Sequence, residues 1–139
     1  LMLSLELNIP CSVHCVSAFD ELIFCLKKFK NHPPVIIHSF SGSMELARSL
    51  SKFGCLFSVG KNLNHNPGKK QTEMLKYIFP SLMTLESDFS ASNTTENLSQ
   101  NIKPYCIKDY LNNASEILSI PTEEIAEKTY KLSTAVFGE

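Results

Sequence analysis

The chain has 139 residues, enough for one domain with a substantial core and too few for two ordinary domains. A hydrophobic content of 43% and a charged content of 19% exclude an intrinsically disordered protein. The net charge of −1 excludes a molecule-wide basic field, so any contact with nucleic acid or another phosphate must be local.

The first part of the sequence predicts a helix, a short strand, a second helix and a second short strand. Residues 1–8 have the pattern of the end of an amphipathic helix, and since the sequence starts with Leu rather than Met, we expect a C-terminal piece of a longer protein. Residues 11–15 form a short strand. Ser17 and Asp20 have the spacing of a capping box at the start of a second helix. Residues 35–38 are an apolar run of the kind found in strands buried on both faces.

The middle of the chain repeats this alternation of helix and strand. A helix begins at residues 41–43 and is predicted to end with Gly54 as its C-cap. Residues 56–59 form the third strand. A shorter helix over residues 71–79 then leads to the fourth strand at residues 82–86.

The last part of the chain is predicted to be helical after a long loop. Residues 89–101 are rich in Ser, Asn and Thr and have no periodicity. Pro104 suits the first turn of a helix, and Thr122 is predicted to cap a final one. The strict alternation indicates an α/β protein with parallel strands and right-handed crossovers, and one domain over residues 1–139.

Three residues that can bind metal lie at the ends of predicted strands. His14 and His38 end the first two strands, and Asp88 follows the fourth. The carboxyl ends of parallel strands meet at one face, which carries the active site in such folds. We therefore predict a His/His/carboxylate metal site. The alternative for either histidine alone is a structural role, held by a hydrogen bond.

Glu86 lies two residues before Asp88, so both side chains point the same way if the strand continues. Two carboxylates on one face repel each other unless a cation or a shared proton separates them. We predict that Glu86 and Asp88 are catalytic. Solvated loop acids are the alternative.

The stretch from His38 to Ser43 places small hydroxyl residues and a glycine at a strand-to-helix turn. Free N–H groups and hydroxyls at a helix start can bind an oxyanion, so we predict that Ser41, Gly42 and Ser43 bind phosphate. A plain capping loop is the alternative. Lys61 and the two lysines at residues 69–70 could also reach phosphate, but a solvated charged loop is the favoured interpretation.

Neither a membrane span nor a disulfide framework is predicted. No run approaches the roughly 18 apolar residues of a span, and no signal-peptide pattern opens the sequence, so we expect a cytoplasmic protein, or a nuclear one in a eukaryote. The five cysteines are odd in number and irregular in spacing, which favours buried free thiols.

At these residues the chain resembles the TatD family of metal-dependent deoxyribonucleases and related hydrolases. The stretch His-Ser-Phe-Ser-Gly-Ser is the most specific likeness, and Glu-Ser-Asp is close to the family's Glu-Thr-Asp. The matching segments are residues 7–10, 13–15, 38–43, 54–60 and 85–88, with Asn101, Pro104 and residues 137–138 near the end.

The resemblance implies the C-terminal half of a (β/α)8 barrel of the TIM type, with four parallel strands alternating with helices. It implies two divalent metal ions (Mg, Mn or Zn) in the complete site and hydrolysis of phosphodiesters in DNA. By that likeness His14 and His38 are metal ligands, and Asp88 is a ligand or orients water. Metals there would polarise the phosphate and activate a bound water.

The chain departs from the family in ways that weaken the site. The family's His-x-His pair and bridging glutamate belong to the other half of the barrel. Val16 stands where an arginine is usual, and Ser90 and Ala91 replace a Pro and a Tyr. We expect at most one metal ion here, with DNA as the substrate of the longer parent. The alternative is an inactive fragment or degenerate relative that serves as an interaction module. An open half-barrel edge also predicts self-association.

Overall fold

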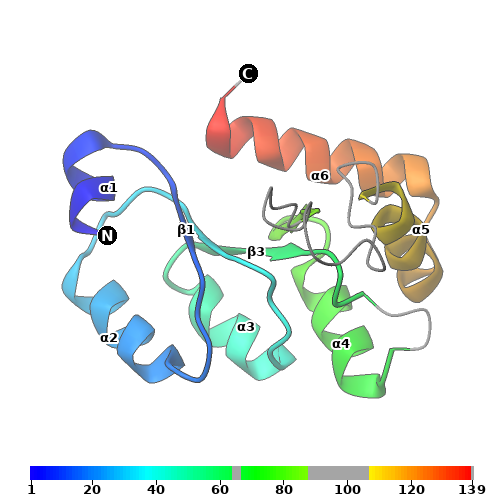
Figure 1. Cartoon of the computed structure of the whole chain (residues 1–139), viewed down its shortest axis with the longest axis horizontal. Coiled ribbons are helices and arrows are strands. Elements are labelled where there is room, and N and C mark those ends of the chain that lie inside the picture. The colour runs from blue at the N-terminus through cyan, green and yellow to red at the C-terminus, as the bar shows by residue number, and fades with distance from the viewer. Residues whose placement is uncertain (64–66, 88–106, 139) are drawn as a thin grey trace, which may run out of the picture.

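Four parallel strands form one sheet in the order β1-β2-β3-β4, with helices between them (Figure 1). The computed structural model describes residues 1–63, 67–87 and 107–138. The elements are α1 (Met2–Leu7), β1 (Cys11–Val13), α2 (Phe19–Lys28), β2 (Val35–Ile37), α3 (Met44–Ser51), β3 (Cys55–Val59), α4 (Lys69–Ile78), β4 (Met83–Leu85), α5 (Ile107–Leu118) and α6 (Thr122–Phe137). The predicted fold, an open α/β half-barrel of four parallel strands alternating with helices, is confirmed.

The register of the sheet aligns the carboxyl ends of its strands. Val13 pairs with Ile37, Ile37 with Phe57, and Phe57 with Met83. Because the strands are parallel and short, residues that directly follow β1, β2 and β4 emerge along the same edge. Side chains from distant parts of the sequence are thereby brought to one place.

The core lies between the sheet and the helices. Every residue of the two central strands, β2 and β3, is buried, as expected for strands that are covered on both faces. Phe57 is the largest of these side chains, and it packs in one cluster with Leu26, Leu50 and Leu75 from α2, α3 and α4. Figure 1 shows these three helices along the same side of the sheet.

Three details of the helix ends differ from the prediction. Ser17 does not cap α2: it has a positive φ of 54°, and the N-cap is Ala18, which has no side-chain hydrogen bond. Thr122 is the first residue of α6, and Pro121 takes the cap position. Helix α3 ends at a C-cap of Lys52, and Gly54 follows at φ 75° where the chain turns into β3. Each difference is a shift of one or two residues in where a helix begins or ends, which residue spacing alone does not determine.

Four of the cysteines lie in the described part of the chain, and all are free thiols, but the predicted burial is wrong for Cys11, Cys15 and Cys25, which are half-buried. Cys55 is fully buried in β3, and burial raises its pKa to about 12. Such a thiol stays protonated and behaves as a small hydrophobic side chain. Cys106 lies outside the described residues. Among the described helices, none has both the length and the apolar sequence that crossing a membrane requires.

Candidate metal centre

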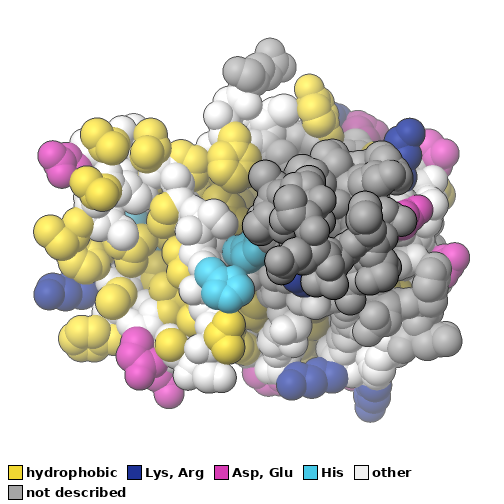
Figure 2. Space-filling view, viewed as in Figure 1, with side chains coloured by type: hydrophobic (Ala, Val, Ile, Leu, Met, Phe, Trp, Pro, Cys, Tyr) yellow, Lys and Arg dark blue, Asp and Glu magenta, His cyan; other side chains and the backbone are white. Residues whose placement is uncertain are grey.

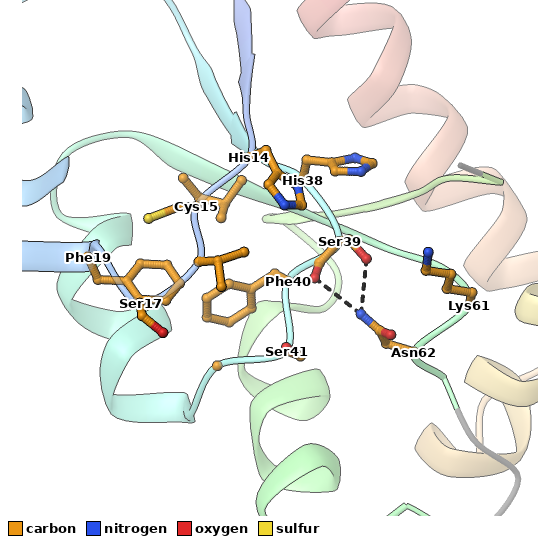
Figure 3. A pocket seen from close by; sticks show the side chains of 13 residues that line it. His14, Cys15, Ser17, Phe19, His38, Ser39, Phe40, Ser41, Lys61 and Asn62 are labelled. Carbon is orange, nitrogen blue, oxygen red and sulfur yellow. Dashed lines mark hydrogen bonds between the residues drawn. The ribbon is translucent and has the colours of Figure 1, made fainter. Parts of the chain in front are cut away.

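A pocket of about 420 Å³ opens at the carboxyl ends of β1 and β2, and His14 and His38 both line it (Figure 3). Each histidine directly follows its strand, and their ring centroids lie 5.6 Å apart. The ring of His14 is exposed, whereas the side chain of His38 is only 24% exposed. The structure therefore brings the two predicted histidines together at the carboxyl ends of the strands.

Glu86 holds the ring of His38. Its Oε2 lies 2.7 Å from His38 Nδ1, and the Ser58 hydroxyl donates to the same oxygen. The backbone N–H of Glu86 donates to the Val59 carbonyl at 3.0 Å, which extends the pairing of β3 with β4 and fixes the position of the carboxylate. The other oxygen, Oε1, is buried and has no hydrogen-bond partner among the described residues.

Gly60 makes this position of Glu86 possible. A Cβ atom at Gly60 would overlap the Glu86 carbonyl oxygen and lie 3.1 Å from the Glu86 Cγ. Atoms cannot approach so closely, so any larger residue would push the two backbones apart. The glycine is therefore required by the close approach of the chain after β3 to the chain after β4.

A second set of hydrogen bonds fixes the loop after His38. The Asn62 side-chain amide donates to the carbonyl of Ser39 at 3.3 Å and to its hydroxyl at 3.0 Å, as Figure 3 shows. Gln71 in turn donates to the Asn62 carbonyl. Ser39 has a positive φ of 50°, so these bonds hold a residue that does not adopt this conformation easily.

Phenylalanines pack behind the histidines. The rings of Phe40 and Phe57 have their centroids 4.6 Å apart, and Phe19 meets Phe40 edge-on at 6.3 Å. Gly42 is part of this packing, because a Cβ there would lie 2.5 Å from Phe40 Cζ and 2.9 Å from Leu46 Cδ2. The floor of the pocket is thus apolar and closely packed.

The three residues predicted to bind phosphate have different surroundings. Ser43 is the N-cap of α3, where its Oγ accepts a hydrogen bond from the Leu46 N–H at 3.2 Å. Gly42 lines the pocket, but packing already explains the absence of a side chain there. Ser41 lines the pocket and is exposed. A phosphate-binding role for this stretch stays a prediction.

Of the three lysines considered for phosphate binding, one lies at the pocket and two lie away from it. Lys61 lines the pocket near His38. Lys69 and Lys70 begin α4 and are exposed, and Lys69 lies 3.9 Å from Glu73. Of the three, Lys61 is the one placed to reach a phosphate in the pocket.

Asp88, the third predicted metal ligand, lies outside the described residues. Within residues 1–63, 67–87 and 107–138, no three His, Cys, Asp or Glu side chains form a group that could hold a metal ion. The described part of the candidate centre is a pair of histidines, His14 and His38, with Glu86 bonded to His38.

Sequence reasoning missed the residues that support the centre: Ser58, Gly60 and Asn62. A signal existed for Ser58, which is a polar residue within an otherwise apolar buried strand. Its register partner is Thr84, another buried hydroxyl, two residues before Glu86. A hydroxyl at such a position needs a hydrogen-bond partner, which the neighbouring strand supplies.

The family model for TatD related DNase matches residues 1–138. The chain belongs to this family. Among curated relatives, the uncharacterised metal-dependent hydrolase YabD of Bacillus subtilis is 26% identical over 99% of this chain and 54% of its own length. A Methanocaldococcus jannaschii protein of the same description is 29% identical over 99% of this chain and 52% of its own. The chain thus spans about half the length of the curated relatives it matches.

Solved structures of TatD proteins show the same fold. The Escherichia coli TatD homologue YjjV superposes with a TM-score of 0.82 at 20% identity, over 99% of this chain and 53% of that one. A TatD family hydrolase from Entamoeba histolytica gives 0.75 at 17% identity, over 98% of this chain and 53% of that one. Four strands are half of the eight that close a barrel of this type.

Two of the described side chains of this TatD chain, His14 and His38, are of a kind that binds a divalent metal ion. A histidine that binds metal through one ring nitrogen commonly donates its other N–H to a carboxylate, and His38 meets Glu86 in this way when Nδ1 carries the proton. The buried and unpartnered Glu86 Oε1 leaves negative charge that a nearby cation would stabilise. The second imidazole, His14, is close enough to share an ion with His38.

Proposed function

We propose that this chain supplies half of the active site of a metal-dependent phosphodiesterase that acts on DNA. The observation that carries the proposal is the Glu86–His38 hydrogen bond beside His14, at the carboxyl end of a parallel sheet. Family membership supports metal-dependent hydrolysis, and the family's description supports DNA as the substrate.

Each described residue has a distinct part in the proposed site. His14 and His38 would bind the metal, which when bound polarises a phosphoryl oxygen and lowers the pKa of a water molecule. Glu86 fixes the orientation of His38 and keeps its second nitrogen directed outward. Ser41 and Lys61 line the pocket and would contact the phosphate backbone. Asp88 is assigned as a further ligand by the family resemblance.

A non-enzymatic role is the second candidate, and Val16 favours it. Val16 lines the pocket and is 69% exposed, at the position where the family resemblance leads us to expect an arginine. An apolar side chain there cannot neutralise a phosphate. The pocket would then keep its architecture but bind DNA weakly, as in an interaction module that has lost its catalysis.

DNA cleavage tests the proposal directly. Linear DNA is incubated with Mg, Mn or Zn and either the 139-residue chain or the full product of the reading frame that contains it. We expect little or no cleavage by the chain alone, chelator-sensitive cleavage by the full product, and loss of that cleavage on His38→Ala. His32→Ala is the matched control, because His32 lies outside the pocket. A full product that is inactive with every metal, or that is unaffected by His38→Ala, contradicts the proposal.

Val16→Arg tests whether the missing cation explains weak binding. The added charge at the rim should raise the affinity for a short single-stranded DNA roughly tenfold at low salt, an effect that rising salt removes. Fluorescence anisotropy measures it. Phe24→Arg is the control, since Phe24 is 68% exposed, lies outside the pocket and receives the same charge. Equal gains for both variants would show non-specific attraction instead.

A further inference from the structure

The Ser58 hydroxyl connects two parts of the candidate metal centre that come from different strands. It donates a hydrogen bond to Glu86 Oε2, the carboxylate oxygen that also meets His38 Nδ1. It accepts a hydrogen bond at 3.3 Å from the backbone N–H of Ser39, the residue that directly follows His38. The hydrogen bonds therefore form a closed cycle, which runs from the His38 imidazole through Glu86 and Ser58 back to the main chain beside that histidine.

The cycle extends from the pocket into the buried sheet. The side chains of His38 and Glu86 are 24% and 17% exposed, and Ser58 is 4% exposed. Figure 2 shows histidine side chains at the surface, near the centre of the view. The inner hydrogen bonds of the cycle are shielded from water, so a polar group that loses its partner there cannot be solvated instead.

The chemistry of the donors sets the direction of each hydrogen bond in the cycle. A backbone N–H can only donate, so Ser39 occupies a lone pair of the Ser58 oxygen. The single hydroxyl proton of Ser58 goes to Glu86, and an ionised carboxylate can only accept. The other hydrogen bond on Oε2 is then donated by His38 Nδ1. The neutral imidazole carries its proton on Nδ1, and Nε2 is the nitrogen with the chemistry of a metal ligand.

Ser58 also fixes the main chain that carries His38. Its carbonyl accepts a hydrogen bond from the Phe40 N–H at 2.9 Å, while its hydroxyl accepts one from Ser39. The His38 N–H donates to the Val13 carbonyl at 2.9 Å. Three consecutive N–H groups are thus held in place, which helps to keep Ser39 at its positive φ of 50°.

We propose that Ser58 is a positioning residue of the metal centre, which fixes His38 as the Nδ1–H tautomer and orients it to bind metal through Nε2. The hydroxyl acts through Glu86 on the imidazole and through Ser39 on the main chain. The tautomer does not depend on any reaction, whereas the consequence for metal binding rests on the proposed function.

Thr84 provides a matched comparison in the same sheet. It is the register partner of Ser58 and, like Ser58, is 4% exposed. Its hydroxyl is not a member of the cycle. Thr84→Val therefore removes a buried hydroxyl next to the cycle and leaves the cycle itself intact, while valine keeps the shape of threonine.

Nuclear magnetic resonance of the imidazole nitrogens tests the tautomer. The full product of the reading frame is labelled with isotopic histidine, stripped of metal with a chelator and measured in alkaline buffer, where an imidazole is neutral. We expect the His38 signals, assigned by their absence from His38→Asn, to show a proton on Nδ1. Ser58→Ala should give a mixture of both tautomers. Ser58→Thr, which keeps the hydroxyl, and Thr84→Val should each keep the single tautomer.

Calorimetric titration of the same variants with zinc measures the consequence for metal binding. Ser58→Ala should weaken zinc binding about tenfold, at the lower end of the cost of losing an outer partner of a ligating histidine. Ser58→Thr should restore most of the affinity. Thermal melting by circular dichroism checks that each variant folds, and Ser58→Cys, with its weaker S–H donor, replaces Ser58→Ala if that variant does not fold.

Three results would overturn the proposal. One is a proton on His38 Nε2 in the unmodified protein, and another is an unchanged tautomer in Ser58→Ala. The third is an equal loss of zinc affinity in Ser58→Ala and Thr84→Val, which would show a general effect on the sheet. If the Nδ1–H tautomer is found and depends on Ser58, but the unmodified protein binds no zinc, the proposed function fails while the assignment of the tautomer to Ser58 is supported.

Discussion

Gly60→Ala should lower the free energy of unfolding by about 3 kcal/mol, at the upper end of the cost of overpacking a buried site. The added Cβ would meet the backbone carbonyl of Glu86, which cannot rotate away as a flexible side chain could. The strain falls where β3 and β4 end, so Glu86 should also lose its contact with His38. Chemical denaturation monitored by fluorescence or circular dichroism measures the change.

Gly68→Ala is the matched control for this prediction. Gly68 is exposed, has a φ of −65°, and has open space where a Cβ would lie, with no atom within 4 Å. Alanine there should change the free energy of unfolding by less than about 1 kcal/mol in either direction, because alanine is a poorer N-cap than glycine but makes the unfolded chain less flexible. Equal effects at Gly60 and Gly68 would show that the close approach to Glu86 is not what requires glycine.

Glu86→Gln should reduce the affinity of the chain for a divalent metal by about 10- to 100-fold, the usual cost of removing an outer partner of a ligating histidine. Glutamine has nearly the same shape and can still accept from Ser58, so the fold should survive. What is lost is the negative charge that orients the ring of His38. Titration with Zn or Mn, followed by calorimetry, measures the affinity.

Glu73→Gln provides the comparison, because Glu73 is an exposed acid on α4, away from the histidines. It should leave metal affinity unchanged. Two results for Glu86→Gln would refute the assigned role. Unchanged affinity would mean that Glu86 does not orient His38, and a complete loss of the bound ion would mean that Glu86 is itself a ligand.

The sequence by itself determined the order of strands and helices and the position of both histidines at strand ends. These features depend on local information: the apolar runs at residues 35–38 and 56–59, the helical spacing between them, and polar residues where each strand stops. The alternation of strands and helices then indicates parallel strands joined by helical crossovers. The meeting of His14 and His38 follows from that arrangement, because adjacent parallel strands end together.

The contacts of Glu86 form only in the folded protein. By spacing alone it was an acid two residues from Asp88, with a predicted catalytic role. In the folded chain its carboxylate forms hydrogen bonds with His38, which is 48 residues earlier in the sequence, and with Ser58, which is 28 residues earlier. Those contacts depend on the register of β3 with β4 and on the space that Gly60 leaves, neither of which a local pattern contains.

The helix ends and the exposed face of α1 were also decided by the fold. Ser17 and Thr122 have the residue types of helix caps, but Ser17 lies one residue before the N-cap of α2, and Thr122 is already the first residue of α6. The apolar residues of α1 fit an amphipathic pattern, yet Met2 and Leu3 face outward while Ser4 is buried. Periodicity shows that a helix has two faces, and only the packing of the sheet determines which face is covered.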